Sequence, residues 1–317
     1  MSGPRVSICI PTYDRPEGLR VAIESVLEQG VDDLEIVVSD NHTSAQDVVE
    51  TLGDQRVRYV ANETNVGAAK NAELALDRSR GELLGVLHDD DRLLPGYLEA
   101  VVTAFNEDPT LGVAFTNHYF DDGSRLAKRE CQLQGGTYNA FLEPLLEFLP
   151  VPITATIMRR TVWLESRPLP DLLSVDYVIF VRAAIAGWPF RYIDEPLMVY
   201  RVHPNQLTNA SSRATEDAVA LWEMFEFTDD RCEAWRRRRL ALALVGRAAT
   251  CIRTNRLPEA RADLDRAMSL DESFTGIEAR LLRLAADSGV IGASLRGGLR
   301  VRRLSKAVWS DVWRPKP

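Results

Sequence analysis

The chain has 317 residues, of which 45% are hydrophobic and 26% are charged, a balance typical of a soluble globular protein with one large domain or two smaller ones. Its formal net charge of −8 argues against a nucleic-acid polymer as a partner. The four cysteines match no metal-binding spacing, so we interpret them as reduced thiols. Residues 1–5 lead directly into a strand pattern, and no apolar run approaches membrane-spanning length. We therefore expect a cytoplasmic protein.

Strand and helix patterns alternate over residues 1–117. Short apolar runs that end in polar residues predict strands, and amphipathic stretches between them predict helices. The expected strands are 6–10, 34–38, 57–60, 83–87 and 113–116, and the expected helices are 16–29, 45–52, 67–76 and 95–105. This alternation predicts a mostly parallel, Rossmann-like α/β sheet flanked by helices.

The fourth expected strand leads straight through His88 into three consecutive aspartates, Asp89, Asp90 and Asp91. Crowded carboxylates repel one another unless a cation or hydrogen-bond donors offset their charge, and Mg²⁺ or Mn²⁺ suits such oxygens. The alternative is that one aspartate caps the next helix and the others are solvated. Ligands of open α/β sheets bind at the carboxyl ends of the strands, where this triplet lies, and this position favours a cation site. The sequence contains neither a dinucleotide-binding nor a P-loop fingerprint.

The pattern is less regular beyond residue 117. We expect a loop or hairpin over 121–136, a helix over 138–149, a half-buried strand over 153–158, a helix over 173–186, and strand patterns at 190–193 and 197–203. From 214 onward only helices are expected, with a hairpin of 240–252 and 258–268 that looks like one tetratricopeptide-type unit. A single unit cannot bury its own face, so it would pack on the first domain or on a second subunit in a homodimer.

The last segment, 295–317, is basic and amphipathic. Such a segment could lie on an anionic membrane surface, which would make the protein peripheral at the inner face of the membrane. The alternative is a helix that docks on the protein's own acidic body.

Several of these segments together resemble family 2 glycosyltransferases, which have the GT-A fold. They are 6–15, 35–41, 65–67, 87–91, 175–182 and 200–203, and their order and spacing carry the resemblance over about residues 5–208. The resemblance implies a GT-A domain over 1–212, with a nucleotide-sugar half (1–117) and an acceptor half (118–212), followed by a helical C-terminal region (213–317).

The family implies inverting transfer of a sugar from a nucleotide diphosphate donor, typically UDP-linked, with the help of Mg²⁺ or Mn²⁺. The acceptor would be a hydroxyl or amine of a glycan, a lipid-linked molecule or a natural product. A non-catalytic scaffold on the same body is an alternative from another class. A sugar nucleotidyltransferase is a second alternative, although 11–15 lacks the glycines of a phosphate loop after the first strand.

By similarity, the resemblance also implies roles for individual residues in donor binding. Pro11, Thr12 and Tyr13 would line the nucleotide pocket, with Tyr13 stacked on the base. Arg15 and Lys70 would also bind the donor, and Asp40 would accept a hydrogen bond from the edge of the base.

The triplet would be the family's metal-binding acidic motif. Asp90 is the first choice for a metal ligand, Asp89 would help to bind the donor, and Asp91 and His203 would complete the metal site. Asp176 would be the general base that activates the acceptor, and its place at the start of a helix favours the ionised carboxylate.

Three positions depart from the family pattern. His88 stands where many relatives have Asp, Val175 stands where many have Glu, and Glu73 stands where Asn is common. His88 could be a ligand or a space-filling neighbour.

Overall fold

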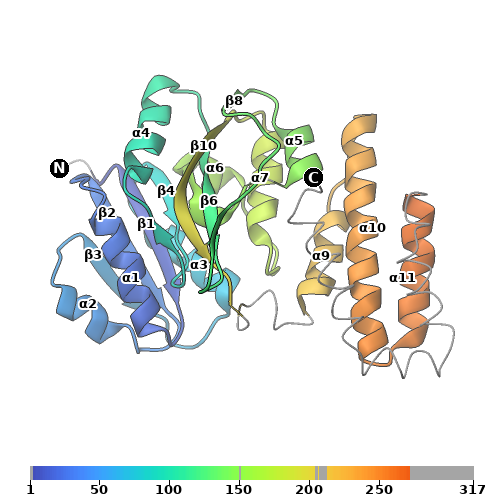
Figure 1. Ribbon diagram of the computed structural model, residues 1–317, viewed down its shortest axis with the longest axis horizontal. Helices are drawn as coiled ribbons and strands as arrows, with labels where there is room; N and C mark the ends of the chain where they lie inside the picture. Colours follow the sequence, from blue (N-terminus) through green and yellow to red (C-terminus); the bar gives the residue numbers. More distant parts are fainter. Residues whose placement is uncertain (1–2, 150, 204–205, 207–212, 272–317) are drawn as a thin grey trace. The chain divides into compact units, whose positions relative to one another are not determined.

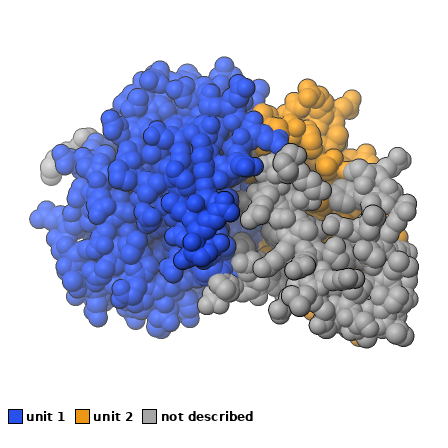
Figure 2. Space-filling model, in the orientation of Figure 1, with its two compact units in different colours: residues 1–141, 150–206 blue, residues 142–149, 207–317 orange. Residues whose placement is uncertain are grey.

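The computed structural model describes residues 3–149, 151–203, 206 and 213–271 of the chain. These residues form two compact units, shown in different colours in Figure 2. The first unit contains residues 1–141 and 150–206, and the second contains 142–149 and 207–317. The basic segment 295–317 lies outside the described residues, as does the loop at 207–212.

The first unit is built on a sheet with the strand order β3-β2-β1-β4-β9-β6-β10-β5. The N-terminal half comprises β1 (Val6–Thr12), β2 (Leu34–Asp40), β3 (Val57–Ala61) and β4 (Leu83–Val86), and its strands all pair in parallel. Nearly every residue of β1, β2 and β4 is buried, as expected for parallel strands with helices on both faces. The predicted α/β sheet is therefore confirmed.

The second half of the sheet is mixed. It comprises β5 (Arg92–Leu93), β6 (Val113–Asp121), β7 (Leu126–Lys128), β8 (Gly136–Tyr138), β9 (Thr156–Arg159) and β10 (Phe190–Arg201). β9 lies between β4 and β6 and runs antiparallel to both. The strand predicted over 153–158 is present as β9, but it begins only at Thr156, after a short 3-10 helix over Ile153–Ala155. Its half-buried character is wrong, because this central position buries side chains on both faces, including Ile157 and Met158.

Two other predictions for the second half are refined. The segment 121–136 contains the hairpin formed by β6 and β7. The two strand patterns at 190–193 and 197–203 form the single strand β10, whose pairing with β6 shifts register around Pro196. Since β10 runs parallel to β6, its far end reaches the same sheet edge as the ends of β1 and β4, and it delivers His203 there (Figure 1).

Helices flank this sheet. They are α1 (Pro16–Leu27), α2 (Gln46–Leu52), α3 (Ala68–Arg78), α4 (Tyr97–Glu107), α6 (Arg160–Glu165) and α7 (Val175–Ile185). The apolar stripes of α1 and α4 share a buried core with alternate residues of the strands, such as Ile8, Ile10 and Ile36. α3 packs on β1 and β2.

The described part of the second unit is helical. It comprises α5 (Leu142–Phe148), α9 (Arg213–Glu223), α10 (Asp230–Arg253) and α11 (Leu257–Leu270). Asp229 is the N-cap of α10, and its carboxylate accepts a hydrogen bond from the backbone N–H of Cys232. The predicted helical hairpin is confirmed, with α10 and α11 joined at Thr254–Arg256. None of the described helices is both long enough and apolar enough to cross a membrane.

Candidate active site

The three aspartates lie where β4 leaves the sheet, beside the end of β1. These strands are parallel neighbours, so their carboxyl ends meet at one edge. The Thr12 hydroxyl, at the end of β1, donates a 2.8 Å hydrogen bond to Asp89 Oδ2. Arg15 follows β1 and donates from one guanidinium nitrogen to Asp89 Oδ1 at 3.1 Å and to Asp90 Oδ2 at 2.9 Å. Both oxygens of Asp89 therefore have protein donors.

Helix α1 presses closely against the backbone of the triplet. A Cβ atom on Gly18 would lie 2.3 Å from the carbonyl oxygen of Asp89, which is closer than atoms can approach. The absence of a side chain at Gly18 therefore allows the first turn of α1 to pack directly against the backbone of Asp89.

Asp90 is contacted by two nitrogen-bearing side chains. Besides Arg15, the Nε2 atom of His203 lies 2.9 Å from Asp90 Oδ2. Burial raises the pKa of Asp90, but the His203 hydrogen bond and the charges of His88 and Arg15 outweigh this effect, so the pKa falls below its usual value. Asp90 is thus held as a carboxylate, the form that a metal ion requires.

Asp91 is in a different environment. It is 2% exposed, and its Oδ1 accepts a 2.9 Å hydrogen bond from the backbone N–H of Arg201. Its Oδ2 is buried and has no hydrogen-bond partner of standard geometry among the described residues, although the nearby Thr154 hydroxyl acts to lower the pKa of Asp91. Burial and the neighbouring Asp90 carboxylate raise the pKa of Asp91 well above its usual value. A buried carboxylate oxygen without a donor is costly unless a ligand compensates it.

A divalent cation fits this environment. His88, Asp90 and Asp91 each offer one ligand atom, and these atoms lie within 4.8 Å of one another. The sequence prediction combined Asp90 and Asp91 with His203 instead. The structure places His203 in contact with Asp90, and it adds His88, whose role the sequence left open.

The predicted general base, Asp176, lies in the first turn of α7. The backbone N–H groups of Asp176 and Tyr177 at the helix N-terminus favour the ionised carboxylate, as expected from the sequence. Burial, which the sequence did not reveal, has a larger and opposite effect, so the pKa of Asp176 rises to about 6.

Tyr200 of β10 lies within electrostatic range of both Asp176 and the triplet. Burial raises the pKa of Tyr200, and the negative charges of Asp91, Asp90 and Asp176 raise it further.

The predicted nucleotide-binding residues differ in accessibility. Tyr13 is 50% exposed and makes an edge contact with His42, so its ring can receive a base. Asp40 is fully buried and accepts hydrogen bonds from the N–H groups of His42 and Ala45 and from the Tyr59 hydroxyl. Direct contact between Asp40 and a base would require the loop that follows β2 to move.

Pro11 and Lys70 complete the predicted set. Pro11 pairs with Ser39 in the sheet and is partly buried. The Lys70 ammonium group forms a 2.7 Å ion pair with Glu73 and is about half exposed, so it could exchange this partner for a phosphate.

The sequence analysis missed Asn71. This residue is 2% exposed, and its amide donates to the backbone carbonyls of Ser39 at 2.9 Å and of Thr12 at 3.2 Å. It therefore fixes the spacing between the ends of β1 and β2. The available signal was its place one turn before the buried Ala75, on the apolar face of α3.

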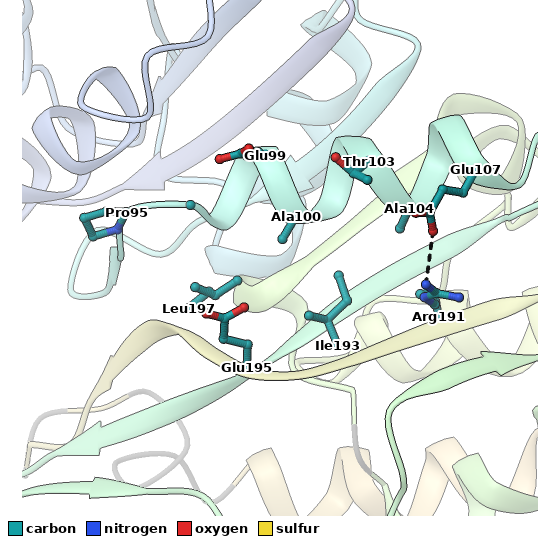
Figure 3. A pocket seen from close by; sticks show the side chains of 11 residues that line it. Pro95, Glu99, Ala100, Thr103, Ala104, Glu107, Arg191, Ile193, Glu195 and Leu197 are labelled. Atoms are coloured by element: carbon teal, nitrogen blue, oxygen red, sulfur yellow. Dashed lines mark hydrogen bonds and ion pairs between the residues drawn. The ribbon is translucent and has the colours of Figure 1, made fainter.

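A surface groove with a volume of about 420 Å³ lies between α4 and β10 (Figure 3). Glu99, Thr103 and Glu107 of α4 line one side, and Arg191 and Glu195 of β10 line the other, with an ion pair of 3.2 Å between Arg191 and Glu107. None of the predicted site residues lines this groove.

Comparison with known proteins identifies the domain that carries the acidic turn. The model of the family described as "Glycosyl transferase family 2" matches residues 7–163, a stretch that runs from β1 through the triplet to α6. The chain belongs to this family through that domain. A Campylobacter jejuni relative named GalNAc(5)-diNAcBac-PP-undecaprenol beta-1,3-glucosyltransferase is 30% identical over 165 residues, which cover 45% of this chain and 53% of the relative. The match thus spans about half of that curated protein.

Solved structures support the GT-A fold of this family 2 chain. TarS 1-349 from S. aureus, in complex with UDP-GlcNAc, superposes with a TM-score of 0.66 at 16% identity and covers 97% of this chain and 91% of its own. The mannosyltransferase PcManGT from Pyrobaculum calidifontis, in complex with GDP-Man and Mn²⁺, superposes with a TM-score of 0.58 at 19% identity and covers 99% of this chain and 88% of its own.

Proposed function

We propose that this protein is an inverting, divalent-metal-dependent glycosyltransferase that uses a nucleotide diphosphate sugar, with UDP as the favoured nucleotide. The observation that carries the proposal is that the carboxylates near one sheet edge have different surroundings. Asp90 contacts Arg15 and His203, Asp91 keeps a buried oxygen without a donor among the described residues, and Asp176 lies within electrostatic range of the same Tyr200 hydroxyl as both. The family match and the nucleotide-sugar complexes of TarS and PcManGT support it.

The proposed mechanism divides the work between two groups of residues. Asp90, Asp91 and a histidine would hold Mg²⁺ or Mn²⁺, which supplies charge stabilisation for the departing diphosphate. Arg15, which already bridges Asp89 and Asp90, would keep these carboxylates in place, and Tyr13 would stack on the base.

Asp176 would take the proton of the acceptor hydroxyl on the opposite face of the sugar. A pKa of about 6 suits this role, because the carboxylate is ionised at neutral pH and still basic enough to receive a proton in the transition state. Attack on the face opposite the leaving diphosphate inverts the configuration of the anomeric carbon.

We propose a glycan or lipid-linked acceptor, since the C. jejuni relative is named for an undecaprenol-linked substrate and the segment 295–317 of this chain is basic and amphipathic. Binding of the full chain and of a chain shortened at residue 294 to anionic liposomes tests the proposed peripheral membrane contact. Equal binding by the two would remove the support that this segment gives to a lipid-linked acceptor.

The function is tested by incubating the protein with UDP- and GDP-sugars and Mn²⁺, and by following both nucleotide release and sugar transfer. We expect a chelator to abolish both reactions and Asp176→Asn to slow transfer by about 10²–10⁴-fold. NMR of the anomeric proton in the product reports inversion. Equal rates with and without chelator, and in Asp176→Asn, would refute the mechanism. Formation of a nucleotide sugar from a sugar phosphate would indicate a nucleotidyltransferase instead.

A further inference from the structure

The imidazole of His88 lies on the same side of the acidic turn as Asp91. The backbone N–H of Asp91 donates a 3.1 Å hydrogen bond to the carbonyl of His88, which closes a four-residue turn from His88 to Asp91. His88 Nδ1 consequently lies 3.7 Å from Asp91 Oδ2, a distance that leaves room for a cation to bridge the two atoms. The imidazole is 41% exposed, so packing does not account for its position.

The hydrogen bonds of the triplet show which atoms remain for a cation. Thr12 and Arg15 occupy both oxygens of Asp89, so Asp89 has a structural partner at each oxygen. Arg15 and His203 both approach Oδ2 of Asp90, and among the described residues no hydrogen bond reaches its Oδ1. Asp91 Oδ2 is buried without a donor among the described residues, and it faces His88. One ligand atom from each of His88, Asp90 and Asp91 lies within 4.8 Å of the others, so a cation could be held between these three side chains.

We propose that His88 is a nitrogen ligand of the divalent cation and sets the metal preference of this enzyme. Mg²⁺ favours an all-oxygen shell, whereas Mn²⁺, Co²⁺ and Ni²⁺ form stronger bonds with imidazole nitrogen. A site of one imidazole and two carboxylates should therefore select Mn²⁺ and its later neighbours over Mg²⁺. This inference rests on the proposed metal-dependent function and specifies which cation serves it.

The test measures metal binding to the full chain directly. Mn²⁺ is titrated in the presence of UDP and followed by EPR, Mg²⁺ and Co²⁺ are added as competitors, and pulsed EPR detects ¹⁴N nuclei coupled to the bound Mn²⁺. The variants are His88→Asp, which supplies an oxygen ligand, and His88→Ala, which truncates a half-exposed side chain without leaving a cavity. His42→Gln is the matched control, because His42 lies at the same sheet edge but contacts Tyr13 and Asp14.

We expect ¹⁴N coupling in the wild type and in His42→Gln. Both His88 variants should lose that coupling, or lose one of two coupled nitrogens if His203 also binds. The preference for Mn²⁺ over Mg²⁺ should fall about tenfold or more in His88→Asp, within the range seen when the surroundings of a metal site are altered.

Unchanged ¹⁴N coupling and unchanged selectivity in the His88 variants, with coupling lost in His203→Gln, would overturn the inference and leave metal-dependent transfer intact. A wild-type protein that binds no Mn²⁺ in the presence of UDP would overturn both.

Discussion

The sheet edge of the first unit and the α10–α11 hairpin of the second both contain buried charged groups, but these groups differ in their hydrogen-bond partners. In the hairpin, Arg247 donates two hydrogen bonds to Asp263, at 2.6 and 2.9 Å, and a third to Glu216. At the sheet edge, Asp91 is more deeply buried than Asp263 but keeps one oxygen without a donor among the described residues. Charges that serve the fold are paired with one another, whereas a charge left without a partner is available to a ligand.

The strongest test of this contrast is Asp91→Asn. The amide keeps an oxygen for the Arg201 N–H but removes the negative charge that would hold a cation. We expect transfer to fall by about 10²–10³-fold, as when a group that stabilises transition-state charge is removed. We expect no loss of thermal stability, because an unpaired buried carboxylate is itself costly. Steady-state kinetics and calorimetry measure the two effects, and retained activity with a lowered Tm would reverse the interpretation of this residue.

Asp263→Asn should show the opposite behaviour. It leaves Arg247 with a weakened partner inside the hairpin, so the free energy of unfolding should drop by about 2–4 kcal/mol. The Kd for Mn²⁺ should not change. The double variant Arg247→Met/Asp263→Leu should recover most of the stability, because an apolar pair avoids the desolvation cost. Chemical denaturation checks both, and a double variant as unstable as the single one would show that the ion pair has more than a structural role.

The sequence predicted which side chains lie together at the sheet edge better than it predicted the strand pairing and hydrogen bonds that hold them there. Strand ends of a parallel sheet share an edge, so Thr12 and the triplet could be placed together without a structure. The antiparallel insertion of β9 between β4 and β6 was not predictable, because the pairing of a short strand depends on its partners rather than on its own pattern.

The sequence also could not show which carboxylate oxygens of the triplet accept hydrogen bonds and which do not. This depends on the turn that closes on Asp91 and on the pairing of β5 with β10, which brings the Arg201 N–H to that carboxylate. The same holds for Asp176. The position of a helix N-terminus can be predicted from residues, but the burial that outweighs its effect on the pKa depends on the packing around α7.

Asp176, which is partly exposed, extends the comparison, since no described Lys, Arg or His forms an ion pair with it. With a pKa near 6, Asp176 is protonated below that pH and cannot act as a base. We expect kcat/KM for transfer to rise about tenfold per pH unit up to pH 6 and then level off. Its raised pKa also means that the free energy of unfolding should decrease as pH rises through 6.

Asp176→Asn provides the check on that profile. The low-pH limb of its residual activity should disappear, and at pH 8 the variant should be at least as stable as the wild type, because it no longer buries a charge. Rates measured across pH 4.5 to 8 in a saturating concentration of metal separate this group from the metal ligands. A limb that persists in Asp176→Asn belongs to another group.

The smallest effect that we expect comes from Gly18→Ala. In an ordinary exposed helix position, this change would stabilise the protein by about 1 kcal/mol. Here the new Cβ would lie 2.3 Å from the Asp89 carbonyl oxygen, so α1 or the acidic turn must move, at a cost of about 1–3 kcal/mol. We expect a lower Tm and an increase of a few fold in the Kd for Mn²⁺, whereas Val21→Ala, an exposed change on the same helix, should leave both nearly unchanged. If Gly18→Ala raises the Tm and leaves the Kd unchanged, the acidic turn can shift to fit the new methyl group without moving its metal ligands. The position of Asp91 would then depend on the hydrogen bond from the Arg201 N–H of β10, and α1 would not contribute to it.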